Sequence, residues 1–220
     1  MNAKQTIFFK VLGENREPCH GGSGQWPEPG IWTEEREVRP CRSGWHLCRS
    51  RDLLRWLGPC LWLAEAEDVT EAEDKVVAKR ARLIRQLPWD NTTARLWAAD
   101  CAESALPHWE GKHPDDSRPR KAIAAARAYA KGEITPRKLA AAHNAASNAA
   151  QSAASNAAYN AAKSAAQSAV HAAYGAAYGA ANGAACSAAC SAADDAAYSV
   201  AKRAMVKNLL ETYLGLKAGW

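Results

Sequence analysis

Large apolar side chains are missing from a long stretch of this 220-residue sequence. Between Leu139 and Leu209 there is no Leu, Ile, Phe or Trp, and Lys163 is the only formally charged residue between Leu139 and Ala193. Ala, Ser, Asn, Gln and Gly fill the stretch, and they supply too little transfer free energy for a membrane-spanning helix. A recognisable catalytic motif is also missing from the whole sequence. These absences favour a non-catalytic protein without a membrane span.

A disulfide framework and an export signal are missing as well. The sequence holds seven Cys, an odd number that cannot pair completely within one chain. Residues 1–12 lack the long apolar core and the small-residue cleavage site of a signal peptide. We therefore expect a cytoplasmic protein whose thiols are free.

The cysteines and histidines do not have the spacing of a zinc site. Cys-x-x-Cys is absent, and Cys19, His20, Cys41, His46 and Cys48 match none of the usual ligand patterns. We therefore expect no metal and no other cofactor. The preferred interpretation is that His46 and Cys48 alternate with apolar residues along a strand, with the small thiols packed inward.

Charge and tryptophan content divide the sequence. The net charge of +5 is not gathered into a long basic run, which argues against nucleic acid as a partner. Eight of the nine Trp precede Glu110, whereas the alanine-rich stretch carries Tyr instead. This shift predicts two domains with different packing, residues 1–88 and residues 89–220.

Alanine pairs recur almost every fourth residue in the stretch that lacks large apolar residues. Alanine is the best helix former, and a four-residue repeat is close to the helical period. Each such step turns a helix by about 400°, so the alanine stripe drifts by about 40° per step and leaves any one face. We therefore expect several helices in an all-α bundle, with breaks near Gly175, Gly179, Asn182-Gly183 and residues 152–156.

Polar residues between the alanines are the main candidates for a binding site. They are uncharged and recur at helical spacing, which is typical either of a pocket for a base or ring or of a wetted outer face. A long uncharged surface is unusual for a soluble helix, so burial against a second copy is another interpretation, and we expect a homo-oligomer. The candidates are His143, Asn144, Asn148, Asn156, Tyr159, Asn160, His171, Tyr174 and Tyr178.

Two helices are expected ahead of the alanine-rich stretch. Thr93–Leu106 has helical character and is expected to end at Pro107, and Trp97, Cys101 and Ala105 would share its buried face. Arg118–Lys131 is expected to end at Gly132 in the C′ position. A third helix is expected to start at Thr135-Pro136.

Two arginines at the start of the second expected helix allow two interpretations. Arg118 and Arg120 could hold a phosphate or a carboxylate at a helix N-terminus. They could instead pair with Asp100, Glu103 or the two adjacent aspartates and tie helices together. The acidic neighbours favour the second interpretation.

The first 88 residues predict a small α+β module. Apolar and β-branched runs predict four strands, a short helix should be capped by Ser50 and stopped by Gly58-Pro59, and an acidic turn should separate the last two strands. The expected strands are Thr6–Leu12, Ile31–Val38, Leu61–Glu65 and Val76–Leu83, and the turn is Asp68–Asp74. Together the two regions predict an α+β protein, a small α+β module followed by an alanine-rich all-α bundle.

This module resembles one found in phage and bacterial proteins. In that module a C-x-x-G-(aromatic)-H-x-C segment precedes a helix and an apolar strand, and a DK…A…R-x-(I/L)-x-R-x-L strand closes it. The resemblance implies a fold and brings no activity with it. The matching residues are Gly44, His46, Cys48, Asp74, Lys75, Arg85 and Leu87.

The Gly-(aromatic)-His segment is also loosely similar to the NAD-binding half of ADP-ribosyltransferases. That resemblance implies that His46 and nearby aromatic residues hold nicotinamide and ribose, with Glu65 or Glu67 performing the transfer. An NAD-using transferase is therefore an alternative to a binding protein.

Residues 89–201 are similar to an alanine-rich immunity protein family. The matching segments are Leu96–Glu103 and Pro114–Arg120, with Ala122-Ile123 and Gly132 after them. The resemblance implies a binding or sequestering protein of the bacterial or phage conflict type, with an immunity or anti-defence role. Its partner would be a small nucleotide-like signal, or a toxin or defence protein, and a structural oligomer packed through alanine faces is a further alternative.

Overall fold

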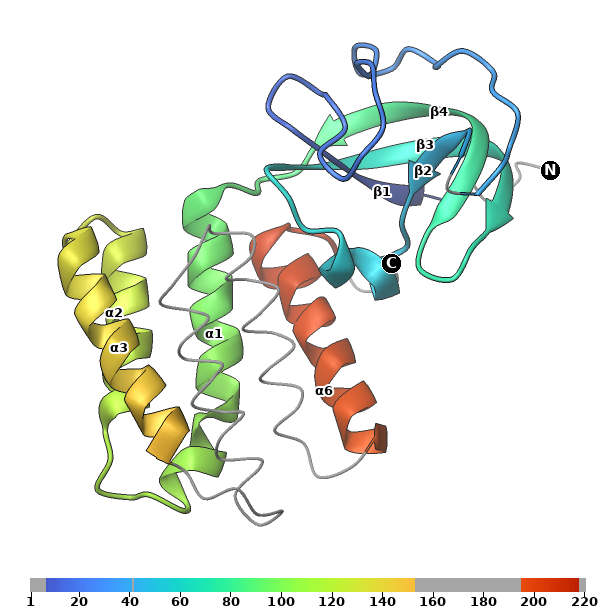
Figure 1. Ribbon diagram of the computed structural model, residues 1–220. Helices are drawn as coiled ribbons and strands as arrows, with labels where there is room; N and C mark the ends of the chain where they lie inside the picture. Colours follow the sequence, from blue (N-terminus) through green and yellow to red (C-terminus); the bar gives the residue numbers. More distant parts are fainter. Residues whose placement is uncertain (1–6, 41, 153–194, 218–220) are drawn as a thin grey trace. The chain divides into compact units, whose positions relative to one another are not determined.

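A computed structural model describes residues 7–40, 42–152 and 195–217, and its chain forms two compact units (Figure 1). The first unit contains residues 7–89 and 210–217, and the second contains the described residues between 90 and 209. The assignment of independent domains to residues 1–88 and 89–220 stays a prediction. Each unit is described separately below.

The first unit is a curled antiparallel sheet of four strands. These are β1 (Ile7–Leu12), β2 (Trp45–Leu47), β3 (Cys60–Glu71) and β4 (Val76–Gln86), in the order β1-β3-β4-β2. Phe9 and Cys48 exchange two backbone hydrogen bonds of 2.9 Å, which join β1 to the residue after β2. The two edges of the sheet therefore meet, and β1 and β2 lie side by side.

Three of the four expected strands are confirmed, and the one at Ile31–Val38 is wrong. That segment runs extended beside β4, and Gly30, Thr33 and Arg36 donate backbone hydrogen bonds to β4 carbonyls. Only every third residue bonds in this way, whereas a strand ladder needs a period of two. The Thr33 hydroxyl adds a bond by accepting from the Ala81 N–H, and Thr33 is buried.

The acidic turn is shorter than expected because β3 continues to Glu71. Cross-strand ion pairs support the extension, with Glu65 paired to Arg82 and Glu67 to Arg80. The expected short helix is a 3-10 helix, η1 (Ser50–Arg55), whose N-cap is Arg49. The prediction that Ser50 caps it is therefore wrong.

Apolar residues from all four strands form the core of the first unit. Phe8 and Leu12 of β1 meet Trp62 and Ala64 of β3 and Leu83 of β4. The separate segment 210–217 adds buried leucines at 210, 214 and 216, and the Leu216 N–H donates to the Leu210 carbonyl. Two distant parts of the chain therefore belong to this unit.

The second unit begins with three helices, of which the first is longer than expected. They are α1 (Asn91–Glu110), α2 (Arg118–Ala130) and α3 (Pro136–Ser152). α1 contains Pro107, so the prediction that this residue ends the helix is wrong. The last turn persists because Trp109 is 1% exposed and its indole N–H donates to the Asp116 carbonyl at 3.0 Å.

Other features of the three helices are confirmed. Trp97, Cys101 and Ala105 are all buried on the inner face of α1. Gly132 has φ +75° and follows the C-cap residue Lys131, so it occupies the C′ position of α2. α2 contacts both α1 and α3.

The described chain ends with α6 (Asp195–Asn208) and a π-helical turn, η2 (Leu209–Tyr213). The expected breaks at Gly175, Gly179 and Asn182-Gly183 lie outside the described residues, and so do residues 153–156 of the earliest expected break, because α3 is described only as far as Ser152. The all-α bundle is therefore shown only in part. None of the described helices is long and apolar enough to cross a membrane.

Candidate functional site

Three of the candidate binding residues lie on α3. Asn144 and Asn148 are exposed and four residues apart, whereas His143 is half-buried. Leu139, Ala146 and Ala149 are the buried positions of the helix, on the side that packs inward. The remaining alanine-tract candidates, Asn156, Tyr159, Asn160, His171, Tyr174 and Tyr178, lie outside the described residues.

The outward side of α3 is a stripe at helical spacing. We define the α3 outer face as Arg137, Ala141, Asn144 and Asn148, all of which are exposed. It presents one guanidinium, one methyl group and two amides. Such a face has hydrogen-bonding groups and little side-chain bulk, so a partner surface could approach the helix closely.

Arg118 and Arg120, the candidates at the start of α2, each pair with a carboxylate. Arg118 donates to Asp116 through Nε at 2.8 Å and Nη2 at 2.6 Å. Arg120 donates to Glu110 through Nε at 2.7 Å and Nη2 at 2.8 Å. The hydrogen bonds from Arg118 lower the pKa of Asp116. The arrangement ties the start of α2 to α1 and the preceding loop, and a ligand role for either arginine stays a prediction.

Asp100 and Glu103 pair with Arg127, which the sequence analysis did not single out. Arg127 donates to Asp100 through Nη1 and to Glu103 through Nη2. The Glu110–Arg120 and Glu103–Arg127 pairs have residue numbers with the same sum, as expected where two antiparallel helices keep one register. A search of the sequence for oppositely charged residues whose residue numbers add up to the same value would have found the Glu103–Arg127 pair.

Exposed lysines and arginines without a carboxylate partner occur along the helical unit, and Lys131, Arg137 and Lys138 lie at the junction of α2 and α3. They are exposed, and no ion pair is seen for them within residues 90–152. Asp90, Asp115 and Glu133 are the acidic residues of this part that also lack an ion pair, and Asp90 instead accepts from the Thr93 N–H at the start of α1. The unpaired cations are Lys112, Lys121, Lys131, Arg137 and Lys138.

His46, from the sequence segment that suggested a transferase, lines a cavity of about 700 Å³ in the first unit. Glu65 and Glu67 are not among the described residues that line it, and they pair with Arg82 and Arg80. The carboxylate that a transferase would need is therefore held elsewhere on the sheet. No group of three or more His, Cys, Asp or Glu that could hold a metal occurs in the described part of the chain.

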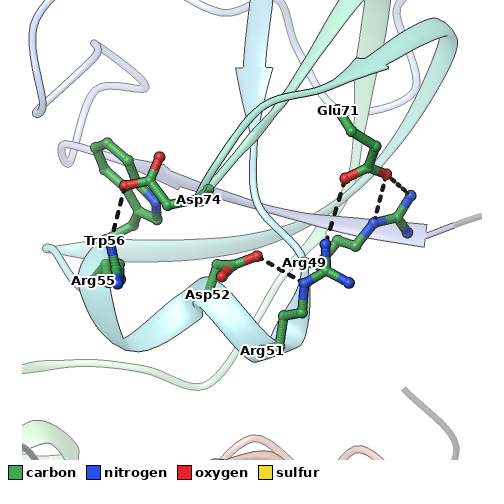
Figure 2. A network of polar contacts seen from close by, with 7 residues as sticks. All are labelled: Arg49, Arg51, Asp52, Arg55, Trp56, Glu71 and Asp74. Atoms are coloured by element: carbon green, nitrogen blue, oxygen red, sulfur yellow. Dashed lines mark hydrogen bonds and ion pairs between the residues drawn. The ribbon is translucent and has the colours of Figure 1, made fainter.

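One wall of this cavity is fixed by a polar network at the end of the β3–β4 hairpin (Figure 2). The Trp56 indole N–H donates to the Asp74 carbonyl at 2.8 Å. Glu71 accepts from Arg49 and pairs with Arg51 at 3.6 Å, which ties the hairpin to η1. Trp56 therefore has a defined orientation at the edge of the cavity.

The second unit has ion pairs between α1 and α2 and exposed polar side chains on α3. Residues 89–202 match the family of Imm-5 like putative immunity proteins, a match that covers just over half of the chain, and the chain belongs to this family. A search of curated proteins and a search of solved structures found no significant match. Family membership suggests a non-catalytic, immunity-type role. The resemblance of the first 88 residues to a phage and bacterial module stays a prediction.

Proposed function

We propose that this protein is a non-catalytic immunity protein whose helical unit binds a protein toxin and holds it inactive. The observation that carries the proposal is the family match over residues 89–202, which covers α1 to α3 and the start of α6. The position of the transferase candidates supports it, because Glu65 and Glu67 do not line the cavity that contains His46.

Surface charge supports an acidic partner. The arginines at 118, 120 and 127 are neutralised by carboxylates, whereas the cations around the α2–α3 junction are not. Unpaired charges of one sign accelerate association with a surface of the opposite sign and favour the matching partner over others. The α3 outer face begins at this junction, since Arg137 belongs to both. We infer that the toxin contacts the α3 outer face and the adjoining basic residues.

Co-expression with a candidate toxin encoded in the same genome tests this function. The wild-type protein is expected to restore growth and to form a complex in size-exclusion chromatography. The double variant Arg137→Glu/Lys138→Glu is expected to weaken the complex at least about tenfold, because like charges would replace complementary ones. The control Arg85→Glu/Lys217→Glu makes the same charge change at exposed positions of the first unit and is expected to leave binding unchanged.

Three finer expectations accompany this proposal. A nucleotide-like ligand for the helical unit, a phage anti-defence role and a homo-oligomer remain proposals. Light scattering of the purified protein measures the oligomeric state directly.

In the co-expression experiment, growth rescue without complex formation would contradict toxin sequestration. Equal loss of binding in the two double variants would contradict it as well.

A further inference from the structure

The cavity of the first unit lies where the two edges of the sheet meet. Its wall includes Lys10 of β1 and Trp45 and His46 of β2, together with Trp26 from the loop before the extended segment. The volume of about 700 Å³ is within the range of small-molecule sites. The lining residues that the structure describes all fall between positions 9 and 75, within the first unit.

Cations are prominent among the described residues that line this cavity. Lys10, Arg36, Arg42 and Lys75 are lining residues, and no Asp or Glu is found among the described ones. Arg36 pairs with Glu34, and Lys75 lies 3.9 Å from Asp74, but neither carboxylate belongs to the lining. Lys10 and Arg42 have no carboxylate partner in the described residues. An excess of unpaired positive charge in a concave site favours an anion.

Tryptophan rings supply the apolar part of the wall. Trp26 and Trp45 form an edge-to-face pair with centroids 5.0 Å apart, and the Lys10 ammonium lies 5.0 Å from the Trp26 ring. The Trp45 indole N–H is satisfied by the Glu34 carbonyl at 2.8 Å, as Trp56 is by Asp74. Trp26 and Trp45 are buried, so the half-buried ring of Trp56, beside Lys75, is the aromatic surface of the wall that a planar ligand group can reach.

His46 contributes a buried polar atom without a partner. Its Nε2 is buried and makes no hydrogen bond in the described part of the chain. Burial and the nearby Lys10 lower the pKa of His46, so the ring is neutral at pH 7, and the ring is hydrogen-bonded to the Gly44 backbone. Because Nε2 is itself buried, His46 contributes a neutral surface to the cavity wall and adds no charge beside the cations.

We propose that this cavity binds a small organic phosphate that carries a planar ring, a ligand of the nucleotide class. The phosphate would lie near Lys10 and Arg42, and the ring would lie against Trp56. The proposal concerns the first unit and holds whether or not the helical unit binds a toxin.

The state of Lys10 makes the proposal dependent on pH. Burial lowers the pKa of Lys10 to about 8, and the groups around it are His46 and the thiols of Cys19 and Cys48. Burial raises the pKa of both thiols, that of Cys48 to about 12, so they stay neutral near pH 8. Lys10 is therefore the group that changes charge there. A bound phosphate favours the charged ammonium, and affinity is expected to fall as pH rises above about 8.

Isothermal titration calorimetry with the full-length protein at pH 7 tests the proposal. The probes are AMP, GMP, CMP and UMP, with adenosine and inorganic phosphate as the two separated parts of AMP. At least one nucleotide is expected to bind about tenfold or more tightly than either part. Lys10→Met and Arg42→Ala are each expected to weaken that nucleotide about tenfold, since each removes a charge-assisted hydrogen bond.

Arg85→Ala is the matched control for Arg42→Ala, because Arg85 is also exposed and unpaired but does not line the cavity. It is expected to change affinity less than twofold. Arg42 is exposed, so its removal leaves folding intact even if Lys10→Met does not fold. The proposal is overturned if none of the four nucleotides binds at millimolar concentration, if a nucleotide binds no better than adenosine or phosphate, or if Arg85→Ala weakens binding as much as Arg42→Ala.

Discussion

The ammonium of Lys10 donates a hydrogen bond of 2.9 Å to the carbonyl oxygen of His46. The two residues are 36 positions apart and belong to the two edge strands of the sheet. Their contact depends on the backbone bonds between Phe9 and Cys48, which bring these edges together. A buried ammonium and a neutral imidazole in the same cavity wall are therefore a product of sheet closure.

Lys10 should give the stability of the protein a distinctive pH dependence. Its pKa is about 8 in the folded protein and about 10.5 in the unfolded chain, so the unfolded state binds more protons between these values. Below pH 8 the folded state bears the cost of a buried charge, and this cost disappears as pH rises to 10.5. The Lys10→Met variant lacks the cost at every pH.

Urea unfolding of both proteins between pH 7 and pH 10.5 measures this effect. The free energy of unfolding of the variant, minus that of the wild type, is expected to be largest at pH 7 and to decrease toward pH 10.5. Comparing the two proteins cancels the opposite contribution of the buried cysteines. A difference that stays constant across the range would show that the pKa of Lys10 is not lowered.

Gly44 should be the least replaceable glycine of the first unit. It has φ +102°, and an added Cβ would lie 2.6 Å from Val77 Cγ1 and 3.2 Å from the Ala78 carbonyl oxygen. Gly44→Ala is therefore expected to cost both backbone strain and steric displacement of β4, more than about 2 kcal/mol in total. Gly24→Ala is the control, because Gly24 has φ +90° but open space around its Cβ position. In thermal unfolding, Gly24→Ala is expected to lose only the free energy that backbone strain costs, about 1 to 2 kcal/mol. Equal losses of stability in the two variants would contradict the steric argument.

Arg127 should stabilise the packing of α1 against α2. Its half-buried guanidinium pairs with two carboxylates of α1, so Arg127→Ala is expected to cost about 1 to 2 kcal/mol in chemical unfolding. Arg137→Ala removes an exposed arginine without an ion pair and is expected to change stability by less than about 0.5 kcal/mol. In a double-mutant cycle with Asp100→Ala, we expect a coupling free energy of about 0.5 to 1 kcal/mol. Coupling near zero would show that the ion pair contributes nothing to the packing.

Trp97 should be essential to the core of the helical unit. It is 0% exposed on the inner face of α1, and Trp97→Ala is expected to cost about 3 to 5 kcal/mol and to abolish toxin neutralisation through unfolding. Val200 is 57% exposed, so Val200→Ala serves as the control and is expected to stay within about 0.5 kcal/mol of the wild type. Circular dichroism during thermal unfolding distinguishes the two. A small loss for Trp97→Ala would mean that the remaining helices carry the core.

Local signals in the sequence predicted the elements that local chemistry controls. The Gly132 C′ position and the Thr135-Pro136 start of α3 depend on backbone preferences of the residues themselves, and both were predicted correctly. Pro107 was misjudged because a distant contact, that of Trp109 with Asp116, outweighs the missing amide hydrogen bond. The segment at 31–38 was misjudged for a similar reason, since its bonds to β4 follow a spacing that no local pattern encodes.

The cavity was harder to predict than the helices. His46 was singled out, but Lys10, Trp26 and Arg42 come from segments whose meeting depends on how the sheet curls. The paired arginines are an intermediate case. The carboxylates at 100 and 103 were recognised as arginine partners, yet choosing Arg127 over Arg118 requires the register of two antiparallel helices.

The first unit is built from residues 7–89 and from residues 210–217, whose leucines are buried. The helical unit is therefore an insertion, held at both ends by the fold that it interrupts. During synthesis the ribosome completes the whole helical unit before the last leucines of the first unit emerge, so the sheet cannot finish its core first. Exchange of residues 90–209 for another helical segment would preserve the first unit only if the new segment again joined residue 89 to residue 210.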